Sequence, residues 1–137
     1  MLFPECTLYL ITDRKLSRGR STVEVVEAAL AGGVDVVQLR EEEAETRFMV
    51  EEGLRVHEVT ARYHVPLLVN DRLDVALAIE AEGVHVGQTD LPAPMARKLL
   101  PAPYILGVST SAREMACEAQ EQQADYIGFG PIYSTTT

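Results

Sequence analysis

The chain has 137 residues, 47% of them hydrophobic, and a formal net charge of −9. This composition predicts one globular domain or part of a larger one, and no apolar run reaches the roughly 18 residues that cross a bilayer. The diffuse negative charge argues against binding to nucleic acid or to an anionic membrane surface.

Strand and helix patterns alternate along the chain. The strand patterns are short runs of Val, Ile, Leu and Tyr almost free of alternating charge, which is typical of strands buried on both faces. The helix patterns have apolar residues at helical spacing or clear end signals, such as Gly32 with Gly33. In chain order we predict a strand at 7–12, a helix at 22–31, a strand at 35–40, a helix at 44–63, a strand at 65–70, a helix at 73–79, a strand at 83–87, a helix at 95–100, a strand at 104–109, a helix at 111–123 and a strand at 125–130.

Two of these helices carry more specific patterns. Ser111 is followed three residues later by Glu114, which predicts a capping box at the start of the helix at 111–123. The long helix at 44–63 is predicted to bury one face, formed by Met49, Val56, Val59 and Tyr63.

Strict alternation of strand and helix predicts an α/β fold with a parallel sheet and right-handed crossovers. An open doubly wound sheet and a (β/α)8 TIM barrel both satisfy this pattern. A barrel usually needs about 200 residues or more, whereas this sequence ends just after its sixth strand. No Pro/Gly/Ser-rich linker divides residues 1–137, so we expect a single domain. It is either an open sheet or the N-terminal three quarters of a barrel, truncated after strand six.

A polar residue follows each predicted strand, where enzymes with parallel α/β folds place their chemistry. Helix N-caps favour the same residue types, so any one of these residues taken alone has a structural explanation. The strand-end polar residues are Asp13, Arg14, Arg40, Asn70, Asp71, Gln88, Asp90, Ser109 and residues 135–137.

Arg40 is the most informative cation among them. Side chains alternate along a strand, so Arg40 shares a side with Gln38. A buried guanidinium requires an anionic partner, and its planar fork suits phosphate. An ion pair with Glu41, with Glu43 or with a neighbouring loop explains the position equally well.

Asp71 and Asp90 follow consecutive strands, so their carboxylates are expected at one mouth of the sheet. Such a pair is repulsive unless it is protonated, paired or bridged by a cation. Oxygen ligands favour Mg²⁺, which often binds one or two carboxylates together with substrate phosphates. Arg72 opposes the dipole of the helix that it precedes, so it either serves Asp71 or a ligand, or is solvated.

The remaining reactive side chains form no recognisable catalytic set. His57 and His64 are expected to be solvated, and His85 to be a hydrogen-bonded core residue. Cys6 and Cys117 lack metal-ligand spacing and are expected to be free, partly buried thiols. The first residues lack the cationic region of a secretory signal, which predicts a cytoplasmic protein.

A family resemblance is carried by the segments LYLITDR, GGVDVVQLRE, PLLVNDRLDVALAIEAEGVHVGQTDLP, ILGVSTS and ADYIGFGPIYSTTT. Together they resemble the thiamine phosphate synthases, in order and over nearly the whole chain. VNDRLDVAL and GVHVGQTDLP are the most specific, and are shared with the related TenI-type thiazole tautomerases. Both groups are (β/α)8 TIM barrels, so the resemblance implies a barrel. It also implies a transferase of thiamine biosynthesis, which condenses hydroxymethylpyrimidine diphosphate with thiazole phosphate to thiamine phosphate and pyrophosphate.

The resemblance further implies roles for strand-end residues. Asp71 and Asp90 would hold the Mg²⁺ ion, and Arg40 and Ser109 would be catalytic. Gln38, Arg40 and Asn70 would contact the pyrimidine diphosphate. The full set of implied substrate-binding positions is Gln38, Arg40, Glu42, Asn70, Ser109, Thr135, Thr136 and Thr137.

Three features depart from the family pattern. Glu42 stands where the family has lysine, and either repels the diphosphate or helps to start the following helix. Ser111 stands where the tautomerases have histidine, which argues against tautomerase chemistry. The last two strands and their phosphate loops do not appear after Thr137, so we expect the native chain to continue and the 137-residue fragment to be inactive.

Two alternatives to a synthase remain at this point: a TenI-like tautomerase, and a non-catalytic paralogue that binds a thiamine precursor. In each case the expected partners are small molecules, without nucleic acid or membrane. A homo-oligomer is compatible with the sequence.

Overall fold

The computed structural model describes residues 8–136. They form six strands and five helices that alternate as predicted. The strands are β1 (Tyr9–Ile11), β2 (Val36–Leu39), β3 (Leu67–Asn70), β4 (Gly83–Val86), β5 (Ile105–Thr110) and β6 (Tyr126–Phe129). The helices are α1 (Thr22–Ala31), α2 (Thr46–Arg62), α3 (Leu73–Ala78), α4 (Ala93–Leu99) and α5 (Arg113–Glu121).

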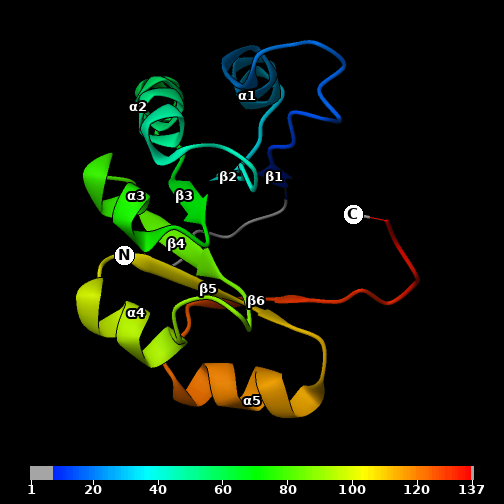
Figure 1. Ribbon diagram of the computed structural model, residues 1–137, viewed down its shortest axis with the longest axis vertical. Coiled ribbons are helices and arrows are strands. Elements are labelled where there is room, and N and C mark those ends of the chain that lie inside the picture. The colour runs from blue at the N-terminus through cyan, green and yellow to red at the C-terminus, as the bar shows by residue number, and fades with distance from the viewer. Residues whose placement is uncertain (1–7, 137) are drawn as a thin grey trace.

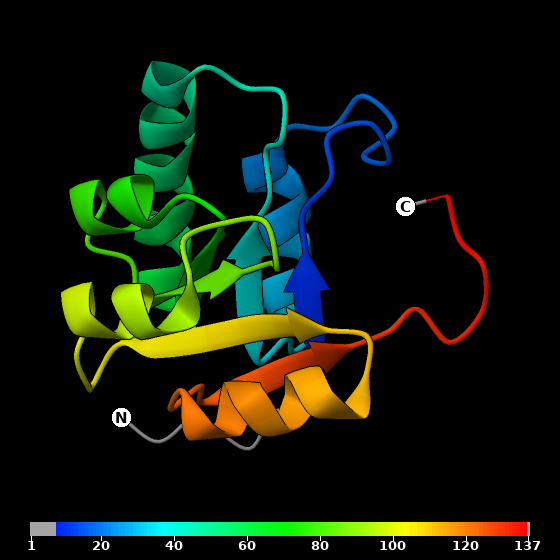
Figure 2. The ribbon, with the colours of Figure 1, turned by 60° about the horizontal axis from the view of Figure 1, so that its bottom comes forward.

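The six strands make one parallel sheet in the order β1-β2-β3-β4-β5-β6, the same as the chain order. The sheet curls, and the helices lie along its convex side (Figures 1 and 2). A doubly wound sheet would reverse its strand order and carry helices on both faces. Sequential order with all helices outside is the arrangement of a barrel wall, so the barrel prediction is confirmed and the open doubly wound sheet is excluded.

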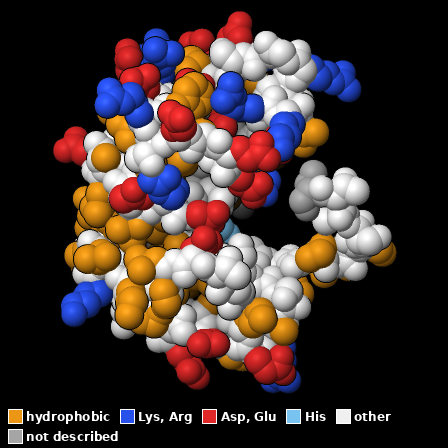
Figure 3. Space-filling model, viewed as in Figure 1, with side chains coloured by type: hydrophobic (Ala, Val, Ile, Leu, Met, Phe, Trp, Pro, Cys, Tyr) orange, Lys and Arg blue, Asp and Glu red, His pale blue; other side chains and the backbone are white. Residues whose placement is uncertain are grey.

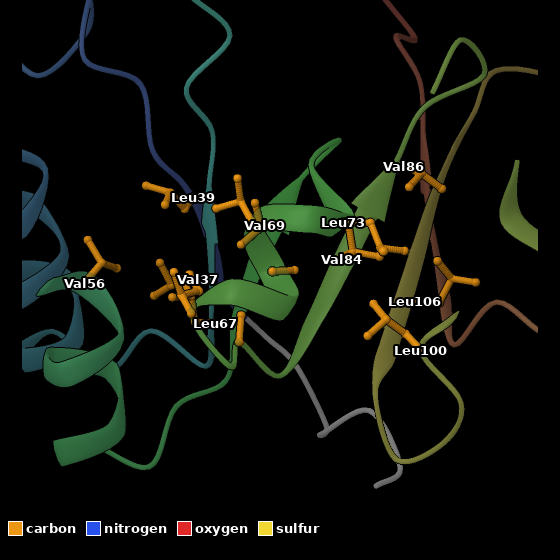
Figure 4. Packing of buried hydrophobic residues seen from close by; sticks show 14 of the residues in the cluster. Val37, Leu39, Val56, Leu67, Val69, Leu73, Val84, Val86, Leu100 and Leu106 are labelled. Atoms are coloured by element: carbon orange, nitrogen blue, oxygen red, sulfur yellow. The ribbon is translucent and has the colours of Figure 1, made fainter. Parts of the chain in front are cut away.

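The main hydrophobic core lies between the sheet and the helices (Figure 4). On β2, Val37 and Leu39 belong to this outer core, whereas Val36 belongs to a small cluster on the other face of the sheet. This is the alternation expected of a strand buried on both faces. Gln38 shares the inner side with Val36, so the strand carries a polar side chain into the barrel interior.

Helix α1 begins with a capping box. The amide N of Glu24 donates to Ser21 Oγ at 3.2 Å, and the amide N of Ser21 donates to Glu24 Oε2 at 2.8 Å. The capping box predicted at Ser111 and Glu114 is wrong. Helix α5 begins at Arg113, and its N-cap is Ala112 rather than Ser111, so Glu114 no longer occupies the position that reaches back to Ser111.

The predicted buried face of α2 is only partly correct. Met49, Val56 and Val59 are buried, but Tyr63 is 42% exposed. Tyr63 is the C-cap of α2, where the chain leaves the helical path, so helical spacing no longer determines where its side chain lies. Cys117 is a free thiol as expected, but it is exposed on α5 rather than partly buried. Cys6 lies outside the described residues.

No helix within residues 8–136 is long and apolar enough to cross a membrane.

Candidate functional site

The carboxyl ends of the six parallel strands lie at one edge of the curled sheet, and the loops that follow them form its mouth (Figure 2). Arg40 follows β2 directly, and Asn70, the last residue of β3, is followed by Asp71. Asp90 lies in the loop between β4 and α4, and Ser109 is the penultimate residue of β5. The fold therefore brings to one end side chains that are far apart in the sequence, as predicted.

Asp71 and Asp90 form a carboxyl pair at this mouth. The pKa of Asp71 is raised to about 7, first by burial and then by hydrogen bonding to Asp90 and the charges of Asp90 and Glu42, against the opposing effect of Arg40. Asp90 is held in place because its Oδ2 accepts a hydrogen bond from the amide N of Gly87 at 2.7 Å. One proton shared between two carboxyl groups, as Asp71 and Asp90 can do here, occupies the place that a cation could take.

The backbone of Asp71 is unusual, with a φ of 62° in the left-handed region. This conformation costs a non-glycine residue about 1–2 kcal/mol, and such residues cluster at functional sites. A hydrogen bond from the amide N of Asp71 to the carbonyl oxygen of His85, at 2.8 Å, holds it across to β4. The turn thus aims the Asp71 carboxyl at the loop that carries Asp90.

Arg40 lies beside this pair and already has an anionic partner. Its Nη2 donates to Glu42 Oε1, and its amide N donates to Thr12 Oγ1 at 3.0 Å. The ion-pair partner of Arg40 is therefore Glu42, rather than Glu41 or Glu43, which the sequence also allowed. Glu43 instead pairs with Lys15 at 2.9 Å. Glu42 therefore lies on the same side as Arg40, and its charge reaches Asp71.

A cleft of about 810 Å³ separates the loop after β1 from the loop after β2. Its lining includes Arg14, Arg40, Glu41 and Glu42, but neither Asp71 nor Asp90, so the carboxyl pair lies outside it. Figure 3 shows acidic side chains gathered beside a hollow on this face of the molecule. The cleft leaves space for a ligand to reach Arg40.

Five buried or half-buried side chains form a second polar group inside the barrel, which we call the inner polar chain: Gln38, Tyr9, Tyr126, His85 and Ser109. Gln38 Nε2 donates to the Tyr9 hydroxyl at 2.8 Å, and the hydroxyls of Tyr9 and Tyr126 lie 2.6 Å apart. Both ring nitrogens of His85 make hydrogen bonds. Nδ1 lies 2.7 Å from the Tyr126 hydroxyl, and Nε2 lies 2.8 Å from Ser109 Oγ. The inner polar chain thus links β2, β1, β6, β4 and β5 in that order.

The prediction that His85 is a hydrogen-bonded core residue is confirmed. His85 is only 8% exposed, and burial lowers its pKa to about 4, so the imidazole is neutral near pH 7. Tyr9 and Tyr126 were missed from the sequence. The sequence feature that could have identified them is a tyrosine at an inward-facing strand position, because a hydroxyl in the interior requires a hydrogen-bond partner.

Other strand-end residues have structural roles. Asp13 Oδ1 accepts from the amide N of Lys15 at 2.8 Å, which is a local turn. Gln88 Nε2 donates to the carbonyl oxygen of Ser109 at 2.7 Å, which links the loop after β4 to the end of β5. Arg72 Nη2 donates to Asp74 Oδ2 at 2.6 Å and to Thr46 Oγ1 at 2.9 Å, so Arg72 is neither simply solvated nor hydrogen-bonded to Asp71 in these contacts.

The expectation for His57 needs correction, whereas the one for His64 does not. His57 is not simply solvated, because its Nε2 lies 2.9 Å from Glu82 Oε1 on a neighbouring element, and Glu82 also accepts from the amide N of Leu67. His64 is exposed, as predicted. Thr135 and Thr136 lie in the exposed segment that leaves β6 (Figure 1), and Thr137 lies outside the described residues.

The carboxyl pair is a suitable but incomplete metal site. Within residues 8–136 no cluster of three or more His, Cys, Asp or Glu side chains could hold an ion. Mg²⁺ characteristically binds one or two protein carboxylates and takes its other ligands from water and substrate phosphates. Asp71 and Asp90 therefore fit Mg²⁺ that arrives with a phosphorylated substrate better than a fully caged structural ion.

Comparisons with known proteins agree with this geometry. A family profile described as thiamine monophosphate synthase matches residues 8–137. The chain is 54% identical over 130 residues to the thiamine-phosphate synthase of Chloroflexus aurantiacus, covering 95% of this chain and 60% of that protein. It is 50% identical over 131 residues to the thiamine-phosphate synthase of Ruminiclostridium cellulolyticum, covering 96% and 62%.

A solved structure, thiamine phosphate pyrophosphorylase from Pyrococcus furiosus, superposes on the chain with a TM-score of 0.87. The two are 41% identical, and the match covers 95% of this chain and 62% of that one. The chain thus spans 60% to 62% of the length of the three relatives named here.

Proposed function

The chain belongs to the thiamine monophosphate synthase family, and on this premise we propose that its protein is a transferase of thiamine biosynthesis. It would join hydroxymethylpyrimidine diphosphate to thiazole phosphate and release pyrophosphate. One observation carries the proposal beyond family membership: a half-buried carboxyl pair, Asp71 with Asp90, lies beside Arg40 at the strand ends.

The carboxyl pair would hold Mg²⁺ at the mouth, once the proton on Asp71 is lost. When bound, this ion neutralises negative charge that develops on the departing diphosphate. Through the ion that they would hold, Asp71 and Asp90 would also help to orient the diphosphate at the mouth. A site arranged for the transition-state charge in advance lowers the barrier without reorganising as the bond breaks.

Arg40 would bind the diphosphate with its planar fork. To do so it has to give up Glu42, whose side chain is 59% exposed and therefore able to turn into solvent. Gln38 and Asn70 would contact the same substrate, and Ser109 its pyrimidine ring.

Thr135, Thr136 and Thr137 would contribute to binding the thiazole phosphate, whose nitrogen attacks the activated pyrimidine carbon. We place the activity in the cytoplasm, where diphosphate-activated metabolites are retained because they do not cross membranes. The substrates are small molecules, and no nucleic acid is involved.

The test is pyrophosphate release by the full-length protein, supplied with both phosphorylated substrates and Mg²⁺. Release that is lost in Asp71→Asn and kept in Asp74→Asn supports the proposal, because Asp74 is an exposed carboxylate paired with Arg72. Binding of the pyrimidine diphosphate without release would instead indicate a non-catalytic paralogue. Isomerisation of a thiazole carboxylate phosphate would indicate a tautomerase, and either result would overturn the proposal.

A further inference from the structure

We propose that His85 is a positioning residue, which fixes the hydroxyl of Ser109 as a hydrogen-bond donor toward an acceptor nitrogen of the substrate's heteroaromatic ring. The inference rests on the proposed function for the identity of the substrate. The direction of the hydrogen bonds within the inner polar chain does not depend on that function.

The first step is the environment of the imidazole. His85 is 8% exposed, and its two ring nitrogens contact hydroxyl oxygens, of Tyr126 and Ser109, rather than carboxylates. A neutral imidazole has one protonated nitrogen, which donates, and one nitrogen with a lone pair, which accepts. Only one of the two neighbouring hydroxyls can therefore donate to His85.

The second step decides which hydroxyl does so. A phenol titrates near a pKa of about 10, whereas the hydroxyl of serine does not titrate in water, so the phenol is the better donor to a basic nitrogen. Tyr126 then donates to Nδ1, and Nε2 carries the proton. The Nε2–H group donates to Ser109 Oγ across 2.8 Å.

The third step is that the rest of the inner polar chain fits this direction. The amide Nε2 of Gln38 can only donate, and it bonds to the Tyr9 hydroxyl at 2.8 Å. Tyr9 then donates to Tyr126 across 2.6 Å, and Tyr126 donates to His85. In each of these four bonds the donor and the acceptor follow in the same order, so the bonds run head to tail from Gln38 to Ser109.

The consequence falls on Ser109, the last member. Its oxygen accepts from His85, which leaves its own proton to be donated elsewhere. Ser109 lies at the end of β5, next to the mouth, and its side chain is half-buried rather than enclosed. A ring nitrogen with a free lone pair is a suitable acceptor, whereas a protonated ring nitrogen is not.

The packing around Tyr126 supports a fixed arrangement. A Cβ added at Gly107, on β5, would lie 2.2 Å from Tyr126 Cζ and 2.3 Å from its hydroxyl oxygen. Only glycine leaves room there for the tyrosine ring to lie inside the barrel and reach His85. The ring centroids of His85 and Tyr126 lie 5.4 Å apart, so the two rings pack against each other.

The direct test is the ¹⁵N spectrum of the ring nitrogens of His85 in the ligand-free full-length protein. The expected result is a protonated Nε2 and an unprotonated Nδ1. Tyr126→Phe keeps the ring but removes the hydroxyl that would donate to Nδ1, so it should weaken or reverse this preference. A protonated Nδ1 in the unmodified protein would overturn the proposal, whether or not the protein has synthase activity.

The kinetic test uses two replacements in the same full-length protein. In His85→Gln an amide nitrogen can occupy the place of Nε2, whereas in His85→Asn it can occupy only the place of Nδ1. We expect kcat/KM for the pyrimidine diphosphate to fall about tenfold more in His85→Asn than in His85→Gln. The KM for thiazole phosphate should stay unchanged in both variants.

Equal losses in the two variants, or parallel rises of both KM values, would mean that His85 acts only through packing and would overturn the positioning role. Thermal unfolding of each variant checks that the fold is kept. If the unmodified protein releases no pyrophosphate, the proposed function fails, and the ¹⁵N spectrum still decides the order of the inner polar chain.

Discussion

The mouth of the sheet and the inner polar chain are both polar groups in the same barrel, but the mouth carries charged side chains and the inner polar chain carries neutral ones. At the mouth, the carboxyl pair of Asp71 and Asp90 is repulsive, and Arg40 is paired with the exposed Glu42. In the inner polar chain each member from Gln38 to Ser109 has a neutral partner within 2.6 to 2.8 Å. The difference teaches that the charged groups lie at the open edge, where we propose that a ligand completes them, whereas the bonds from Gln38 to Ser109 are made within the protein itself.

Charge explains why the two groups differ. Unpaired ionised groups are very unfavourable in a low dielectric, so a charged cluster has to stay partly open to water or ions. Neutral hydroxyl, amide and imidazole groups can be buried once their hydrogen bonds are made. The predictions below test whether the mouth depends on a cation and whether the inner polar chain is rigid without one.

The largest effect is expected from removing one carboxylate of the pair. Asp71→Asn keeps the size of the side chain but removes a charged ligand of Mg²⁺, so we expect pyrophosphate release to fall about a hundredfold or more. The measurement is kcat/KM for the pyrimidine diphosphate at saturating Mg²⁺. Retention of more than about a third of the activity would contradict a cation-dependent mouth.

The next largest effect should come from crowding the inner polar chain. Gly107→Ala places a methyl group on Tyr126, so we expect a loss of about 1–3 kcal/mol in the free energy of unfolding. The matched control is Gly128→Ala, whose Cβ would lie 3.4 Å from His85 Cε1, an ordinary contact. Denaturant unfolding of both variants compares them, and similar losses would show that the interior is adaptable rather than rigid.

The pH dependence of metal binding should distinguish the two groups further. The pKa of Asp71 is raised from 3.8 to about 7, and a protonated carboxyl does not bind Mg²⁺. The apparent affinity for Mg²⁺ should therefore fall by up to about tenfold for each pH unit below 7 and level off above it. Calorimetric titration of the full-length protein measures this, and in Asp71→Asn the dependence should be absent.

The same raised pKa has a consequence for the metal-free protein. The folded state holds the Asp71 proton more tightly than the unfolded state does. Its contribution to stability is therefore complete below the ordinary pKa of 3.8 and is lost as the pH rises through about 7. Added Mg²⁺ should restore stability above that pH, because it binds the ionised pair. Thermal unfolding with and without Mg²⁺ checks the sign, and a rise in metal-free stability over this range would contradict it.

The smallest effect concerns Glu42. Glu42→Gln removes the carboxylate that occupies Arg40 and one of the charges that raise the pKa of Asp71. We expect the affinity for pyrimidine diphosphate to improve a few-fold, because exposed ion pairs are usually worth no more than about 1 kcal/mol. Glu43→Gln is the matched control, since Glu43 pairs with Lys15 away from the guanidinium. If the two variants bind alike, Glu42 does not compete with the ligand.

Much of the fold could be predicted because it depends on local patterns. Runs such as residues 65–69 and 104–108 carry no charged residue and are mostly apolar, and the helix at 22–31 has the same limits in the structure. Predictions failed where one residue of register mattered. Ser111 precedes the N-cap of α5 instead of serving as it, and Tyr63 follows the last turn of α2.

The candidate site could be predicted in part for the same reason. Parallel strands place their carboxyl ends together, so Arg40, Asp71 and Asp90 were expected at one mouth from their positions after strands. The pairing of Arg40 with Glu42, rather than with Glu41 or Glu43, depends on the path of the loop after β2. Sequence spacing does not determine such a path.

By itself, the sequence determined the alternation of strands and helices, the barrel family and the residues that follow each strand, because these depend on periodicity and on ordered motifs. Only the tertiary structure decided that Gln38 and Ser109 are joined through Tyr9, Tyr126 and His85, and that burial and the neighbouring Asp90 raise the pKa of Asp71. Hydrogen bonds between strands and the desolvation of a carboxyl group depend on how the sheet curls. That curvature brings together side chains that are as much as 117 positions apart along the chain.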